Sequence, residues 1–114
     1  MHRDYRLYLD DILISLDRIR EYTLELDREG FSSDSKTVDA VIRNLEIIGE
    51  ASKNLPDAVK ASSPEIEWSK IIALRNILTH EYFGVNHMLL WDIIQNKLGS
   101  LGAACQRLLV APDQ

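Results

Sequence analysis

Apolar residues in the first quarter of the chain recur at steps of three, four and seven. The residues that follow this pattern are Tyr5, Leu9, Ile12, Leu16, Ile19 and Leu26. Because an α-helix turns once in about 3.6 residues, this spacing gathers them on one face and leaves the charged residues between them to solvent. We therefore predict a helix from Arg3 to about Glu29. Gly30 would end it, since glycine is favoured just past the last turn of a helix.

The same periodicity predicts a second long helix from about Lys36 to Asn54. One side of it carries Val38, Val41, Ile42, Leu45, Ile48 and Ser52. The stretch before it, "FSSDSK", is predicted to be a loop in which Ser33, Asp34 or Ser35 caps the helix. Gly49 and Ala51 are small enough to let a neighbouring helix approach closely, although glycine lowers helix stability.

The second half of the chain predicts shorter elements. Pro56 and Pro64 bracket a short helical segment, "DAVKAS". The next helix begins near Glu65 and is broken by Gly84, and Asn86 is a candidate cap for the last helix. The predicted apolar side of that last helix is Leu89, Ile93, Leu98, Leu101, Cys105 and Leu108. Leu90, Trp91 and Ile94 lie off this side, which predicts a second buried surface at a homodimer interface.

Together these elements predict an all-α fold, an antiparallel bundle of four to five helices in a single domain spanning residues 1–114. A chain of 114 residues with 46% hydrophobic and 27% charged residues is an ordinary globular composition. No apolar run reaches the length of a membrane span and the N-terminus lacks a signal-peptide pattern, so we expect a cytoplasmic protein. The single cysteine, Cys105, allows no internal disulfide, and its apolar surroundings predict a buried, inert thiol.

The net charge of −5 argues against a broad basic surface that holds nucleic acid by neutralising phosphates. Any site that acts on RNA or on a nucleotide must therefore be local.

Candidate chemistry gathers in "RNILTHEYFG", residues 75–84. Arg75 and His80 are five residues apart, and five helical steps place two side chains about 140° apart around the axis. The two therefore meet only if the helix unwinds before Gly84, or if a second chain brings the complementary residue.

These residue types suit phosphodiester chemistry. Histidine gives or takes a proton near neutral pH, and arginine offers a planar fork for a phosphate. Asn76 could orient either residue, and no metal is needed if the 2′-hydroxyl of RNA is the attacking group. From spacing alone, however, an arginine and a histidine at a helix end are more commonly a pair that satisfies the last carbonyl groups.

Other groupings are weaker. Tyr82 and Phe83, taken alone, are more often core or interface aromatics. The set His80, Glu81, His87 and Asp92 matches no compact pattern of metal ligands, so we expect no metal and no cofactor.

The pattern "RNILTHEY" resembles the R-x4-H-x-Y motif of HepT-like toxins, in the HEPN superfamily. The likeness extends over nearly the whole chain, through "YLDDILISLDRIREYT", "DAVIRNLEIIGEASKNLP", "PEIEWSKIIALRNILTHEYFGV" and "LLWDII". The motif is made specific by its combination with "RNLEIIGEA" and "PEIEW" upstream.

The resemblance implies a HEPN-like dimer that acts as a metal-independent ribonuclease toxin, with its cleft between the subunits. Arg75 and His80 match the catalytic residues, one holding the scissile phosphate and the other acting as general base or acid to leave a cyclic phosphate. Asn76 matches the polar position after the arginine.

Family members are usually encoded beside a minimal nucleotidyltransferase antitoxin, in a type VII-like toxin–antitoxin pair. In some of them this partner transfers AMP to the motif tyrosine, here Tyr82. An added phosphate would place negative charge beside Arg75. The alternative is a non-catalytic helical module that binds a partner nucleotidyltransferase or a nucleotide.

Overall fold

The computed structural model describes residues 3–80 and 84–112, and these form seven α-helices. Their bounds are α1 Tyr5–Thr23, α2 Arg28–Ser33, α3 Ser35–Asn54, α4 Asp57–Ala61, α5 Trp68–His80, α6 His87–Asn96 and α7 Leu98–Val110. The predicted all-α bundle is confirmed. The count exceeds the predicted four to five because two long segments are each divided.

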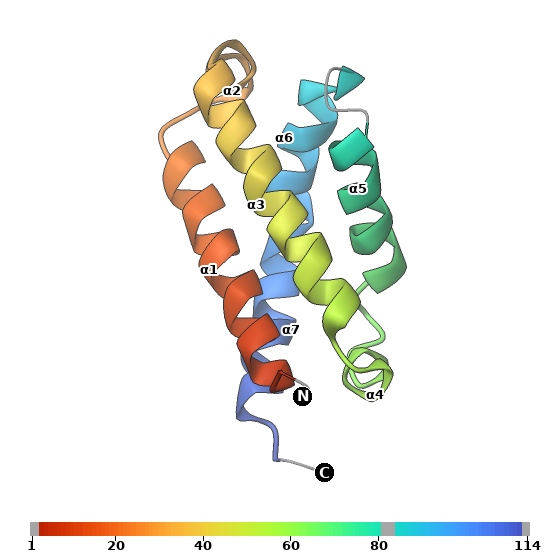
Figure 1. Ribbon diagram of the computed structural model, residues 1–114. Helices are drawn as coiled ribbons and strands as arrows, with labels where there is room; N and C mark the ends of the chain where they lie inside the picture. Colours follow the sequence, from red (N-terminus) through yellow and green to blue (C-terminus); the bar gives the residue numbers. More distant parts are fainter. Residues whose placement is uncertain (1–2, 81–83, 113–114) are drawn as a thin grey trace.

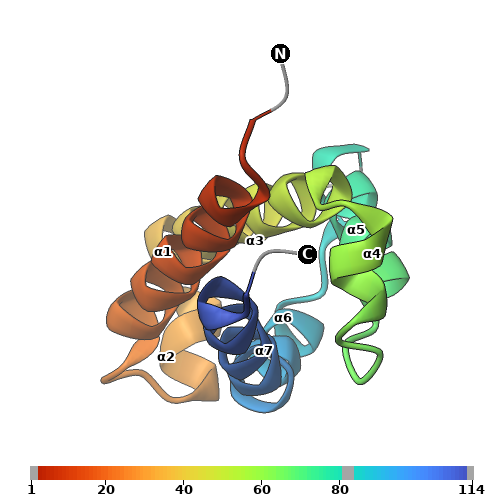
Figure 2. The same ribbon diagram turned by 90° about the horizontal axis from the view of Figure 1, so that it is seen from below.

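The long helices run alternately up and down along an elongated bundle (Figure 1). Helix α3 lies in the middle of one side, packed against α1 on one flank and α5 on the other. Helix α7 closes the bundle against α1, and α6 continues it toward α2 (Figure 2). Helix α5 therefore has α3 as its main neighbour, which leaves much of its surface outside the core.

The division between α1 and α2 corrects the first prediction. Helix α1 ends at Thr23, whose hydroxyl donates a hydrogen bond to the Ile19 carbonyl at 2.8 Å. A new helix then begins because the Asp27 carboxylate accepts from the backbone N–H of Gly30 at 2.7 Å. Gly30 therefore lies inside α2 rather than ending a helix. Phe31, predicted to lie in a loop, is a fully buried core residue.

Helix α3 matches its prediction to within one residue. All six residues of its predicted apolar side are buried. Of the three candidate caps, Asp34 fills the role, accepting from the Thr37 backbone N–H at 3.1 Å. The short segment between the two prolines is also confirmed, as α4.

Two later boundaries differ from the predictions. Helix α5 begins at Trp68 rather than near Glu65. Residues 62, 64 and 65 form turns, and the indole N–H of Trp68 holds this segment by donating to the carbonyls of Lys60 and Ser63. The predicted last helix is broken at Lys97 into α6 and α7, although Asn86 caps α6 as predicted.

The prediction of which side of α6 faces the core was wrong for Leu89 and Leu90. Leu90 is 1% exposed and belongs to the core, whereas Leu89 is 52% exposed. Trp91 and Ile94 are partly buried against the core of the same chain, and the prediction that Leu90 lies on a homodimer surface is wrong, since the chain buries it by itself. The Trp91 ring lies 5.4 Å from that of Phe31, so α2 decides which side of α6 faces inward.

Cys105 is fully buried, as predicted, and burial raises the pKa of its thiol to about 12. Within residues 3–80 and 84–112, no helix combines the length and the apolar character needed to cross a membrane.

Candidate active site

Helix α5 carries the described part of the "RNILTHEY" motif on its C-terminal half. Arg75 is half-buried, while Asn76 and His80 are exposed, and His80 is the last residue of the helix. Tyr82, the predicted modification site, lies outside the described residues. The structure therefore positions three of the four predicted site residues.

Arg75 lies where α5 comes closest to α3. A Cβ atom added to Gly49 of α3 would lie 2.3 Å from the Arg75 Cβ and 3.2 Å from the Ile71 carbonyl oxygen. Such distances are too short for a side chain, so only glycine permits this approach. The prediction that Gly49 admits a neighbouring helix is confirmed, and that helix is the one with the motif.

The guanidinium of Arg75 is held by two side chains. One carboxylate oxygen of Glu50, on α3, lies 3.1 Å from its Nη2. Its Nη1 donates a hydrogen bond of 2.9 Å to the side-chain oxygen of Asn76. Arg75 is thus held by charge from the neighbouring helix and by a neutral acceptor from its own helix.

The backbone of α5 is helical throughout the interval from Arg75 to His80. The Thr79 hydroxyl donates to the Arg75 carbonyl at 2.9 Å, as a residue four positions along a regular helix can. Of the two ways in which Arg75 and His80 might meet, unwinding between them is therefore ruled out. Arg75 faces α3, and His80 projects from a different face of the helix.

An apolar groove of about 590 Å³ runs between α5 and the α6–α7 segment. Its walls include Leu74 and Ile77 of α5 and Leu89 and Ile93 of α6. Ile77 and Leu89 are 50% and 52% exposed, although both are large apolar side chains that line the same groove. We call these four residues the α5–α6 apolar face. Ile77 is three residues from His80, so the face adjoins the motif.

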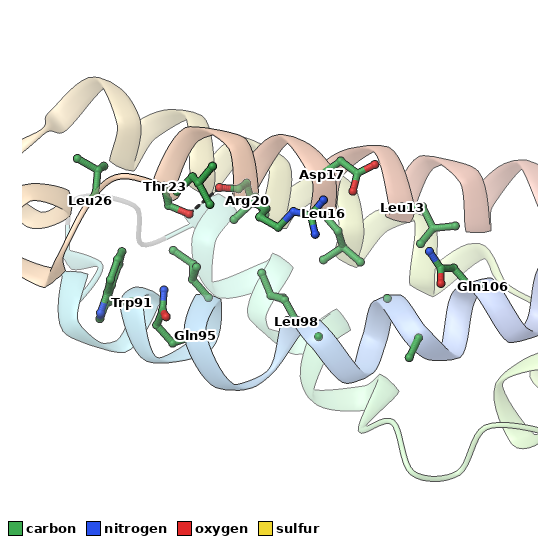
Figure 3. A pocket seen from close by; sticks show the side chains of 16 residues that line it. Leu13, Leu16, Asp17, Arg20, Thr23, Leu26, Trp91, Gln95, Leu98 and Gln106 are labelled. Carbon is green, nitrogen blue, oxygen red and sulfur yellow. Dashed lines mark hydrogen bonds between the residues drawn. The ribbon is translucent and has the colours of Figure 1, made fainter.

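A second groove, of about 610 Å³, lies between α1 and the α6–α7 segment (Figure 3). Leucines, Trp91, Arg20 and Asp17 line it, together with glycines of α7. Neither Arg75 nor His80 contributes to it. They do not line the α5–α6 groove either, to which Ile77 is the contribution of the described motif segment.

The described residues contain no group of three or more His, Cys, Asp or Glu side chains arranged to hold a metal ion. His87, one member of the weak metal set, instead has its Nδ1 3.3 Å from the Ser32 hydroxyl and links α6 to α2. The polar side chains on the C-terminal half of α5 are Arg75, Asn76, Thr79 and His80, and the carboxylate of Glu50 lies beside Arg75.

Comparison with known proteins adds to this geometry. A family profile described as "Ribonuclease HepT-like" matches residues 12–108. The chain belongs to the HepT-like ribonuclease family. The match contains both Arg75 and His80, and it includes the α3 segment that packs against them.

Related HepT-like sequences cover nearly the full chain. A "Probable ribonuclease HepT" of Thermococcus cleftensis is 44% identical over 108 residues, covering 95% of this chain and 98% of the relative. A "Putative RNase" of Methanocaldococcus jannaschii is 43% identical, with coverage of 84% and 79%. Another from Caldanaerobacter subterraneus is 36% identical, with coverage of 91% and 93%. No solved structure gives a significant match.

The pattern of the sequence did not reveal Glu50 as a neighbour of Arg75. It lies in "RNLEIIGEAS", whose apolar periodicity predicts a core helix and assigns no role to the acids on it. The signal that was present is Gly49, immediately before it. Since the glycine marks a close helix approach, the adjacent acid lies beside the partner helix and can reach a cation there.

Proposed function

We propose that this HepT-like protein is a metal-independent endoribonuclease. In this proposal the 2′-hydroxyl of RNA attacks the adjacent phosphorus and loses its proton, and the 5′-oxygen leaves and gains one. The products are a 2′,3′-cyclic phosphate and a free 5′-hydroxyl, so water and metal are not required. Arg75 holds the scissile phosphate and stabilises the charge that develops on it, and His80 gives or takes a proton.

The observation that carries the proposal is the setting of Arg75 within the family motif. A guanidinium on a flexible stem loses much rotational freedom when it binds a phosphate. Here the stem lies against Gly49 and the head contacts Glu50 and Asn76. An arginine that only satisfied the carbonyl groups at a helix end would need neither contact.

The proposal requires two chains. Because α5 stays helical between Arg75 and His80, the two side chains of one protomer point in different directions. A second copy packed on the α5–α6 apolar face would cover Ile77 and Leu89 and bring its own α5 beside the first. Arg75 of one protomer would then act with His80 of the other, at a cleft between them.

The proposal extends to regulation by a nucleotidyltransferase partner in a toxin–antitoxin pair. Transfer of AMP to Tyr82 would add a phosphate to the segment that directly follows His80. Its negative charge would compete with RNA for Arg75, and the nucleoside would obstruct the cleft.

The decisive experiment is RNA cleavage in EDTA by the wild-type protein, His80→Ala and Arg75→Ala, purified in the same way. We expect each variant to lower the rate at least about a hundredfold, as loss of a proton-transfer group or of a charge-stabilising donor does. The new 3′ ends should carry cyclic phosphate. Intact mass of the same preparations detects an adduct on Tyr82.

The outcomes separate the two functions. Cleavage that needs both residues in EDTA supports the nuclease. No cleavage by a protein without an adduct contradicts it and favours the alternative, a helical module that binds a nucleotidyltransferase or a nucleotide. An adduct without cleavage calls for the same assay on Tyr82→Phe.

A further inference from the structure

Glu50 is itself held in place. The side-chain amide of Asn54, one turn further along α3, donates to the Glu50 carbonyl at 2.9 Å and lies 3.5 Å from the carboxylate oxygen Oε1. The other carboxylate oxygen, Oε2, faces Nη2 of Arg75 at 3.1 Å. A chain of polar contacts therefore runs from Asn54 through Glu50 and Arg75 to Asn76 and spans two helices.

Stability does not explain this arrangement. The Arg75 side chain is 30% exposed and that of Glu50 is 49% exposed. Ion pairs exposed to this degree contribute little to folding, because water screens them and both side chains lose freedom. The pair also occurs at the one place where Gly49 allows α5 to lie almost against α3. The contact is thus better suited to fixing one side chain than to joining two helices.

We infer that Glu50 is a positioning residue for Arg75, an inference that rests on the ribonuclease site proposed above. The guanidinium has five N–H groups, and the contacts with Glu50 and Asn76 engage one nitrogen each. The remaining N–H groups are left to bind a phosphate oxygen of RNA. Since the head is already oriented, less freedom is lost when RNA binds and when charge develops.

The charge of Glu50 has an opposing effect, which makes the inference measurable. A carboxylate next to Arg75 repels the phosphate that Arg75 is to bind, so it weakens binding while it improves orientation. Removing the charge but keeping the oxygen should lower KM. Removing the whole side chain should lower kcat. If Glu50 had only a structural role, its two variants would not separate an effect on KM from an effect on kcat.

The test is steady-state cleavage of a defined RNA by Glu50→Gln and Glu50→Ala. We expect Glu50→Ala to reduce kcat at least tenfold. Glu50→Gln should keep kcat within threefold of wild type and lower KM about two- to fivefold. Glu21→Ala, which removes an exposed acid from α1, is the matched control and should change neither constant. A kcat for Glu50→Ala within twofold of wild type, or an equal loss in both Glu50 variants, contradicts the inference.

A second comparison asks whether Glu50 acts through Arg75. In an Arg75→Lys background the side chain is shorter than that of arginine and lacks the planar guanidinium that Glu50 orients. Adding Glu50→Ala to this variant should therefore reduce kcat by less than twofold. The same tenfold loss in this background would show that Glu50 acts by another route and would overturn the inference. Thermal midpoints measured on all variants separate unfolding from these effects.

A readout without RNA keeps this inference distinct from the proposed function. The Nε–Hε signal of Arg75, assigned by its absence in Arg75→Lys, reports side-chain order through its heteronuclear NOE. It should be ordered in wild type and Glu50→Gln and mobile in Glu50→Ala. If wild type without an adduct on Tyr82 does not cut RNA, the proposed function fails, while this NOE pattern still supports the hold of Glu50 on Arg75. Equal order in all three proteins contradicts it.

Discussion

Arg75 is held by two side chains of different charge. Asn76 accepts its hydrogen bond at 2.9 Å from the next position on the same helix, whereas Glu50 reaches it from α3. A neutral acceptor orients the guanidinium without repelling a phosphate. The two contacts should therefore differ in their effect on substrate binding.

For Asn76→Ala we expect a loss in kcat of about three- to tenfold with KM nearly unchanged, because one of the two side chains that hold the guanidinium is removed. Asn76→Asp keeps an acceptor oxygen and should restore kcat, but its charge should raise KM. Steady-state cleavage of the same RNA measures both. A larger loss of kcat in Asn76→Asp than in Asn76→Ala would show that Asn76 does not act by holding Arg75.

The thiol of Cys105 is predicted to be unreactive. Its side chain is fully buried, and desolvation raises its pKa to about 12 from an ordinary value of 9.0. Alkylation by iodoacetamide at pH 8 should be at least about a hundredfold slower in the folded protein than in urea. Because the pKa is raised in the folded state, the stability contributed by the neutral thiol is present below pH 9.0 and is lost as pH rises toward 12. Rapid labelling of folded protein, followed by intact mass, would contradict the burial.

At the scale of helices, Gly49 sets the distance between α3 and α5. In a helix interior, glycine to alanine normally stabilises by about 0.5–1 kcal/mol. At Gly49 the added Cβ would lie 2.3 Å from that of Arg75, so we expect Gly49→Ala to destabilise the fold by about 1–3 kcal/mol. Cleavage should also fall, because the helices separate or Arg75 moves.

Gly102→Ala is the matched control. Its added Cβ would meet only a Leu16 methyl group at 3.5 Å, an ordinary contact, so this variant should gain about 0.5–1 kcal/mol. Urea unfolding followed by circular dichroism measures both variants. Equal stabilisation by the two alanines would mean that α3 and α5 are not in close contact at Gly49.

The helix that the sequence predicted best is α3, although it packs against both α1 and α5. The periodicity of α3 fixed its bounds and its buried side because its apolar residues all face one core. In α1 and α6 the pattern was insufficient. The capping of α2 by Asp27 competes with continuation of α1, and the Phe31 ring turns Leu90 rather than Leu89 inward. These choices depend on contacts between distant segments, which a local pattern does not contain.

In the candidate site, too, the features within one helix could be predicted and the contact between helices could not. The helix that carries Arg75 and His80 and the mismatch of their faces follow from spacing alone, since both residues belong to a single helix, whereas their catalytic role was predicted from the family resemblance. Glu50 was missed because it lies 25 positions before Arg75 and is brought to it only by the packing of α3 on α5. Gly49 provided the one local indication of that contact.

For the whole molecule, the proposal that two chains complete the site can be tested by mixing variants. If Arg75 of one protomer acts with His80 of the other, Arg75→Ala and His80→Ala should complement each other. A mixed dimer holds one intact pair, formed by Arg75 of the His80→Ala chain and His80 of the Arg75→Ala chain. The other pair lacks both residues.

The two inactive variants are therefore unfolded together, refolded as a mixture and assayed for RNA cleavage. With random pairing, half of the dimers are mixed and each has one of two sites, so about a quarter of wild-type activity should return. Adding Ile77→Asp to both chains places a charge on the α5–α6 apolar face and should abolish dimer and recovery together, as seen by size-exclusion chromatography. If native mass spectrometry finds mixed dimers without activity, Arg75 and His80 do not act across the interface as a pair.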